Sequence, residues 1–274
     1  MAELPVSLAG VRGLLKELEV SAREHGVLAV GGARELAAVL RRELSAGAAE
    51  GAVRAGDSPE GAAVLLYVLG RDPGEDDETA LRRARRARVP VIAIAAGPVS
   101  DDVSIPYVLA TDVVRVGSGR GFPLDVIARA VAARVDEDAA PLAGRIPLLR
   151  EAVADRLVSS FSRKNGLFAA AVFLPGADLP VLALNQLRLV LRLAQAYGHA
   201  DVRERLPELV AALGAGVGLR TAARELLDRV PVAGWFVKGA VAYGGTRALG
   251  EATRQRFELV SPTPPPAAGG PAGP

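Results

Sequence analysis

The sequence predicts an α/β domain with a parallel sheet, followed by an all-α helical domain. Two observations lead to this fold class. Short apolar runs alternate with stretches of helical spacing in the first half of the chain, and strand patterns end near residue 146. Such alternation is typical of a parallel sheet that is covered by helices.

Apolar runs mark the expected strands, and helical spacing marks the segments between them. Three of the runs are apolar enough to be buried on both faces, as the central strands of a parallel sheet are. The expected strands are "VLAV" at 27–30, "AVLLYVL" at 63–69, "VPVIAIAA" at 89–96 and "DVVRV" at 112–116. Helices are expected at 6–25 and near 33–44, 76–87 and 123–135, the third with an ion pair between Glu78 and Arg82.

A change of composition indicates how the chain is divided. The segment 135–144, "VDEDAAPLAG", passes from acidic residues to Pro and Gly, which is typical of a linker. The final residues are rich in Pro and Gly and cannot build a core. We expect an N-terminal amphipathic helix at 1–24, an α/β domain at 25–136, a helical linker at 137–165, an all-helical domain at 166–258 and a disordered tail at 259–274.

Small residues are dense between 209 and 250. Glycine costs about 1 kcal/mol relative to alanine inside a helix. So many glycines are tolerated where two helix backbones approach closely. Pro231 can begin a helix at its first turn, so the stretch predicts a tight helical hairpin.

The composition excludes several functions. The chain has no cysteine, which excludes disulfides, thiolate catalysis and Cys-bound metals. Its net charge is only +2, which does not indicate nucleic-acid binding. The first 20 residues lack the basic start and apolar centre of a signal peptide, so a cytoplasmic location is expected. Neither the two histidines nor the serines form a catalytic set, and no cofactor or metal is expected.

A glycine pair stands where a nucleotide-binding α/β domain carries its phosphate loop. In the pattern GxxxxGK[ST], backbone amides, a lysine and a hydroxyl hold the phosphates and magnesium. Here Gly31 and Gly32 are followed by Ala-Arg-Glu-Leu, and Glu35 opposes an anion at the helix N-terminus. We interpret the pair as a tight strand-to-helix turn, and "GSGRG" at 117–121 as a plain turn. The weak candidates for a cofactor site are Gly31, Gly32, Gly117, Gly119 and Gly121.

Two segments resemble Era-type GTPase domains. Residues 63–96, "AVLLYVLGRDPGEDDETALRRARRARVPVIAIAA", resemble the middle strand-helix-strand, and 112–135, "DVVRVGSGRGFPLDVIARAVAARV", the last strand and closing helix. The phosphate loop and a convincing DxxG are missing, and "GPVSD" at 97–101 stands in place of [NT]KxD. The resemblance implies a GTPase-like fold without nucleotide hydrolysis.

The C-terminal half resembles the helical domain of YcjF-like proteins, a domain of unknown function. The similar segments are "ADLPVLALNQLRLVLRLAQAYG", "GLRTAARELLDRVPVAGW" and "AYGGTRALG", within about 166–257. Such domains often follow Era-type GTPase domains and are frequently described as membrane proteins. The resemblance therefore implies a GTPase partner or a membrane surface.

Polar residues interrupt the apolar helical half. The candidate polar seam consists of Asp178, Asn185, Arg220, Arg224, Lys238 and Arg247, with Gln186 and Thr246 beside it. One interpretation is buried pairing between helices, which we favour. The other is a surface for a partner or a lipid.

Three functional hypotheses follow. The first is a non-enzymatic interaction or scaffold protein, which binds a protein partner, the cytoplasmic face of a membrane or further copies of itself as a homo-oligomer. The second is an integral membrane protein anchored by the helices of 167–250, although Pro175, Asp178 and Lys238 interrupt the apolar runs. The third is an enzyme that uses the open end of the sheet, where ligands usually bind. Its cleft would be lined by Gly31, Gly32, Gly97 and Gly117. A GTP-binding protein with atypical motifs is a further alternative.

Overall fold

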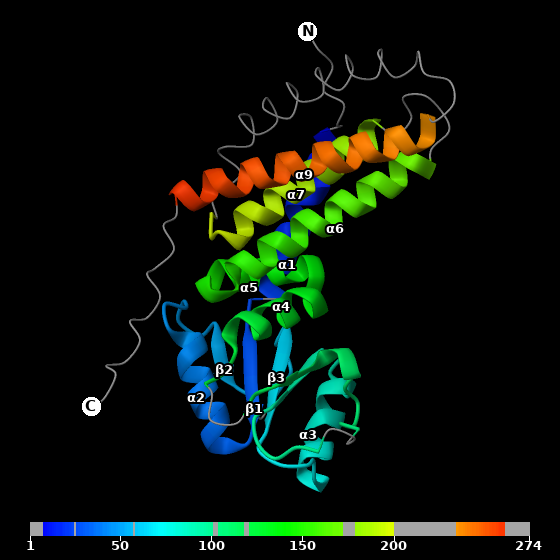
Figure 1. Ribbon diagram of the computed structural model, residues 1–274. Helices are drawn as coiled ribbons and strands as arrows, with labels where there is room; N and C mark the ends of the chain where they lie inside the picture. The colour runs from blue at the N-terminus through cyan, green and yellow to red at the C-terminus, as the bar shows by residue number, and fades with distance from the viewer. Residues whose placement is uncertain are drawn as a thin grey trace, which may run out of the picture.

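The computed structural model describes residues 8–24, 26–56, 58–100, 104–117, 121–171, 179–199 and 234–260. In this part of the chain a parallel sheet with helices on both faces is followed by long helices that stack at one end of the sheet (Figure 1). The predicted fold class, a parallel α/β domain followed by helices, is confirmed.

The sheet has five strands in the order β2-β1-β3-β4-β5, and every pair of neighbours is parallel. This is one of the two common strand orders of doubly wound α/β domains. All four expected strands are present, with slightly different ends. The strands are β1 (Leu28–Gly32), β2 (Val53–Ala55), β3 (Val64–Leu69), β4 (Val91–Ala95) and β5 (Val113–Arg115).

Strand β2 was not expected from the sequence. It is only three residues long, it lies at the edge of the sheet, and none of its residues is fully buried. A short, half-exposed strand has no continuous apolar run, which was the signal used for the others. The three runs expected to be buried on both faces are β1, β3 and β4, and apart from Gly32 every residue in them is buried.

The helices of the α/β domain cover the two faces of the sheet. Because side chains alternate along a strand, Leu66 and Val68 of β3 face one side, while Leu65 and Tyr67 face the other. Helices α2 (Arg34–Ser45) and α4 (Leu124–Val135) pack on the first side. Helix α3 (Glu75–Arg86) packs on the second and carries the expected pair of Glu78 and Arg82, 3.3 Å apart.

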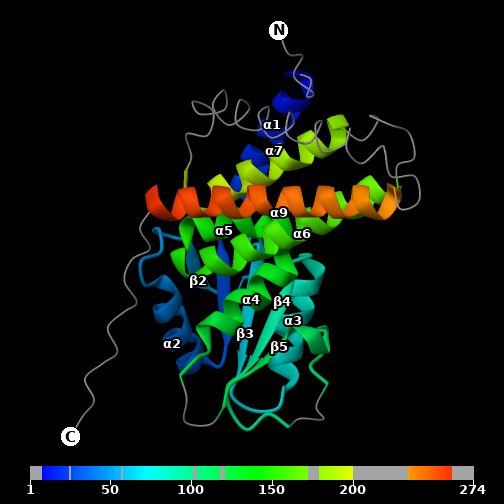
Figure 2. The same ribbon diagram turned by 45° about the horizontal axis from the view of Figure 1, so that its top comes forward.

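The remaining helices stack over the amino ends of the strands (Figures 1 and 2). The side chain of Arg145 ties them to the sheet, because it donates to the backbone oxygens of Gly26, before β1, and Glu50, before β2, at 2.8 and 2.6 Å. These helices are α1 (Leu8–Glu24), α5 (Ala140–Arg145), α6 (Arg150–Ala171), α7 (Leu179–Ala196) and α9 (Gly234–Val260), with 3-10 turns at Ala110–Asp112, Asp136–Ala139 and Pro147–Leu149.

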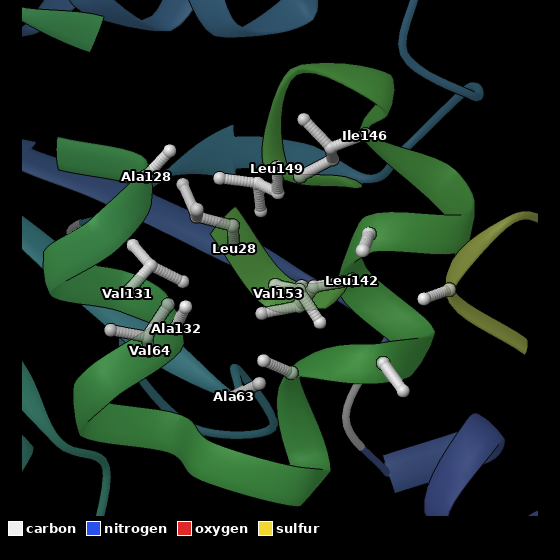
Figure 3. Close-up of a cluster of buried hydrophobic side chains, with 14 of the residues drawn as sticks. Leu28, Ala63, Val64, Ala128, Val131, Ala132, Leu142, Ile146, Leu149 and Val153 are labelled. Carbon is white, nitrogen blue, oxygen red and sulfur yellow. The ribbon is translucent and has the colours of Figure 1, made fainter. Parts of the chain in front are cut away.

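One hydrophobic core runs from the sheet into the helical region. Figure 3 shows Leu28, at the start of β1, against Leu142, Leu149 and Val153. All four side chains are fully buried. The segment 137–165, expected to be a helical linker, contributes Leu142, Leu149 and Val153 to this core and so joins the two halves into one packed body.

The acidic residues that suggested a linker form an acidic turn, Asp136–Asp138, which holds the helices in place. Its three carboxylates pair with cations of α6 and α7: Asp136 with Arg156 at 2.9 Å, Glu137 with Lys164 at 2.6 Å and Asp138 with Arg192 at 3.5 Å. Arg192 is only 3% exposed, and burial lowers its pKa while Asp138 opposes that effect. A shift toward acidic composition here marks an internal contact between helices.

Glycines bring α6 and α9 together. A Cβ added to Gly239 would lie 3.0 Å from the backbone oxygen of Gly166, and one added to Gly250 would lie 2.7 Å from Cγ2 of Val158. Gly239 and Gly250 therefore permit α9 to approach α6 closely, whereas a Cβ added to Gly244 would meet nothing within 4 Å. Residues 200–233, the first part of the expected hairpin, lie outside the described residues, so the hairpin itself is not tested.

Candidate functional site

The carboxyl ends of the strands form the edge of the sheet opposite the helical region (Figure 2). In a doubly wound sheet, ligands bind at this edge, where two neighbouring strands send their helices to opposite faces. Strands β1 and β3 are that pair, because α2 and α3 lie on opposite faces. We call the turn at 32–33 and the loops at 70–74 and 96–100 the switch-point edge.

The turn from β1 to α2 packs directly against β3. Gly32 has a φ of +98°, and a Cβ there would lie 2.1 Å from the backbone oxygen of Val68. The amide of Ala33 donates a 2.8 Å hydrogen bond to that same oxygen. The first amide after the glycine pair is therefore used by the sheet, whereas in a phosphate loop such amides point at the anion.

Asp72 joins two loops of the switch-point edge. It follows β3, and its carboxylate accepts hydrogen bonds from the backbone amide and the hydroxyl of Ser100, beyond β4, at 2.7 and 2.8 Å. The bond from the backbone amide, followed by the one from the hydroxyl, lowers the pKa of Asp72. The carboxylate is thus held in its charged form as a latch between the loops.

Asp77, in the first turn of α3, contacts three further polar groups near this loop. Its carboxylate accepts hydrogen bonds from the hydroxyl of Tyr67 and the amide of Gly74, both at 2.9 Å, and lies 3.4 Å from the guanidinium of Arg71. Burial, and then the bond to Asp77, raise the pKa of Tyr67, which therefore stays a neutral donor at physiological pH. Arg71 also donates to the backbone oxygen of Asp72 at 2.8 Å.

These contacts define what the edge can do chemically. Its carboxylates accept from protein donors, and its arginine and tyrosine donate to protein acceptors. Among the described residues there is no group of three or more His, Cys, Asp or Glu side chains that could hold a metal ion. The contacts at this edge close the loops onto one another.

The structure separates the glycines considered for a cofactor. Gly31 and Gly32 end β1, whereas Gly117 follows β5, and the strands β3 and β4 lie between them. Gly121 is exposed ahead of α4, and Gly119 lies outside the described residues. Sequence reasoning missed the loop at 70–74, because its position beside the β1 turn depends on the strand order.

The polar seam is only partly described. Asn185, on α7, donates to Oδ1 of Asn165 on α6 at 3.0 Å. Thr246, on α9, accepts from Asn165 at 3.0 Å and from Gln186 at 3.1 Å. This network pairs three helices, the interpretation that we favoured, and Asn165 is a member that the sequence did not reveal.

Other residues of the seam lie elsewhere. Arg247 is exposed on α9, where it meets Glu251 at 3.8 Å and the hydroxyl of Tyr243 at 3.4 Å. Lys238 lies near the start of α9 and is half-buried. Asp178, Arg220 and Arg224 lie outside the described residues.

The latch at Asp72 predicts a local pH effect. The pKa of Asp72 is expected below the unfolded value of about 3.9, so its contribution to stability is present above that pH and is lost as the pH falls through the folded pKa. Ser100→Ala removes the hydroxyl donor and leaves the amide, so the pKa should rise part of the way. NMR titration of the carboxyl carbon measures it. Asp125, whose pKa Arg129 lowers, is the internal control. An unchanged Asp72 pKa in the variant contradicts the latch.

No described helix combines the length and the apolar character needed to span a bilayer. Part of the segment proposed as a membrane anchor, 200–233, lies outside this comparison.

No protein-family model, no curated protein and no solved structure matches this chain. The likenesses to Era-type GTPase domains and to YcjF-like helical domains stay predictions that rest on the quoted segments.

Proposed function

We propose that this chain is a non-enzymatic interaction protein, with an α/β domain that does not hydrolyse nucleotide and a helical region that binds a protein partner. The observation that carries the proposal is the hydrogen bond of 2.8 Å from the amide of Ala33 to the backbone oxygen of Val68. The backbone amide of Ala33 is therefore hydrogen-bonded within the sheet, whereas in a phosphate loop the amide would bind the ligand.

The chemistry of phosphoryl transfer supports the same conclusion. Catalysis there depends on positioned cations, a magnesium ion and amides around the phosphates. At the switch-point edge, the cation Arg71 pairs with Asp77, and the first turn of α2 carries the carboxylate of Glu35. Arg34 precedes Glu35 in that turn, so the turn offers no net positive charge to a triphosphate.

The packing of the helical region suits a scaffold. Its helices share one core with the sheet, and the acidic turn pairs with both α6 and α7. Because the two halves are packed together, their surfaces keep a fixed orientation relative to each other. The resemblance to YcjF-like domains favours a true GTPase as the partner and a location in the cytoplasm or at the cytoplasmic face of a membrane.

Nucleotide titration tests the proposal. Magnesium with GTP, GDP or ATP should leave the melting temperature unchanged, because only a ligand that binds the folded state raises it. A fluorescent GTP analogue should show no saturable micromolar binding, and phosphate release should equal that of buffer. The variant Glu35→Gln, which removes the opposing carboxylate, should behave in the same way. Saturable binding that GTP competes, in either protein, refutes the proposal.

Fractionation tests the location. A carbonate or high-salt wash is expected to release any of the protein that sediments with membranes. A requirement for detergent would instead support an anchored protein. A purified Era-type GTPase from the same cell, titrated by calorimetry in its GTP and GDP states, tests the partner.

A further inference from the structure

A cleft of about 360 Å³ lies between α1, α5 and α7, in the helical region and far from the switch-point edge. Its α1 wall is formed by Leu15, Leu18 and Ala22, and Pro141 of α5 and Leu191 of α7 face them. Clefts of this size with a mostly apolar lining and a few polar groups are typical of small-molecule sites.

The leucines of α1 have two different environments. Leu14 is buried against Leu187 and Leu191 of α7. Leu15 and Leu18 are only partly buried and line the cleft. Among the described residues, the contact between α1 and α7 therefore leaves part of the apolar stripe of α1 uncovered, and an apolar ligand in the cleft would cover it.

One cation in the lining has no carboxylate partner in the part of the chain that the structure describes. Arg145, on the α5 wall, donates to the backbone oxygens of Gly26 and Glu50, and within the described residues no carboxylate pairs with it. Its charge is therefore not neutralised there. Gln195 also lines the cleft, but it is occupied, because it donates to the backbone oxygen of Leu18 and accepts from Arg192, both at 3.3 Å.

We propose that this cleft binds a small amphipathic carboxylate, a molecule with an apolar chain and one negative head group. The chain lies against Leu15, Leu18 and Leu191, and the carboxylate faces Arg145. A volume of 360 Å³ holds about a dozen non-hydrogen atoms, if each takes roughly the 30 Å³ of a liquid water molecule. A single cation balances a single negative charge, and Glu19 on the α1 wall disfavours a second.

Decanoate and decanol separate the two parts of this proposal. They share the apolar chain and differ in charge. Calorimetry with the full chain should show saturable binding of decanoate, and decanol should bind about tenfold more weakly, the effect of one charge-assisted hydrogen bond. Arg145→Gln should lower the affinity for decanoate to that for decanol and leave decanol unchanged, while Arg145→Lys should keep part of the preference.

A second variant tests the place of binding. Ala22→Trp puts a large side chain into the cleft and should abolish the binding of both molecules. Ala38→Trp, on the exposed side of α2, is the matched control and should bind normally. If neither molecule binds saturably, if Ala22→Trp binds as the native protein does, or if Arg145→Gln weakens both molecules equally, the proposal is refuted. Should Arg145→Gln fail to fold, Arg145→Lys and Ala22→Trp decide.

Discussion

Gly32→Ala is expected to destabilise the protein by about 3 kcal/mol or more, and to prevent folding if the native stability is small. Two effects add at this position. Alanine at a φ of +98° is strained, and its Cβ would lie 2.1 Å from the backbone oxygen of Val68. Backbone cannot turn aside as a flexible side chain does, so strands β1 and β3 would have to separate. Urea unfolding, followed by circular dichroism, measures the loss.

Gly61→Ala separates the two effects. Gly61 also has a positive φ, +73°, but an added Cβ would meet nothing within 4 Å. The cost there should be the backbone strain alone, about 1–2 kcal/mol. If Gly32→Ala costs no more than Gly61→Ala, the close approach of the turn to β3 is not as described.

Thr246→Val is expected to cost about 2–4 kcal/mol, because it leaves two buried amide donors without their acceptor. The hydroxyl oxygen of Thr246 accepts from both Asn165 and Gln186, and Thr246 itself is fully buried. Valine has nearly the same shape, so the loss comes from unmade hydrogen bonds and leaves no cavity. Thermal and urea unfolding of the purified variant measure it.

Thr253→Val is the matched control on the same helix. Thr253 donates only to the backbone oxygen of Leu249, one turn earlier, and is part-buried. Its replacement should change stability by no more than about 1 kcal/mol. The quadruple variant Asn165→Leu, Asn185→Leu, Gln186→Met, Thr246→Val removes the donors and acceptors of these hydrogen bonds together and should recover much of the loss. Equal effects of the two valine variants would show that the network does not stabilise the helices.

Several glycines of this chain permit close contact between backbones. Gly32 brings β1 against β3, Gly97 lies against the backbone of Gly70, and Gly239 lies against that of Gly166. Gly32 and Gly97 suggested a ligand site in the sequence, but at the switch-point edge they are required for close packing of the backbone. A glycine-rich turn after a strand therefore indicates that the backbone lies close to another group. The glycines alone do not show whether that group is a phosphate or a neighbouring strand.

The sequence by itself determined the fold class, because a central strand that is buried on both faces is apolar at nearly every position. Such a strand is visible in the sequence as a continuous apolar run. It also determined α1 to α4 and the Glu78–Arg82 pair, whose periods of three to four residues are local. Strand β2, too short and too exposed to leave such a run, was missed.

Only the tertiary structure decided which distant residues meet. The strand order placed the loop at 70–74 beside the β1 turn, and helix packing joined Asn165, Gln186 and Thr246, up to 81 positions apart. The acidic turn has the composition of a linker, but in the folded structure its carboxylates pair with cations on α6 and α7. Local patterns record whether a residue is buried, but the identity of its partner depends on chain topology, which no local pattern contains.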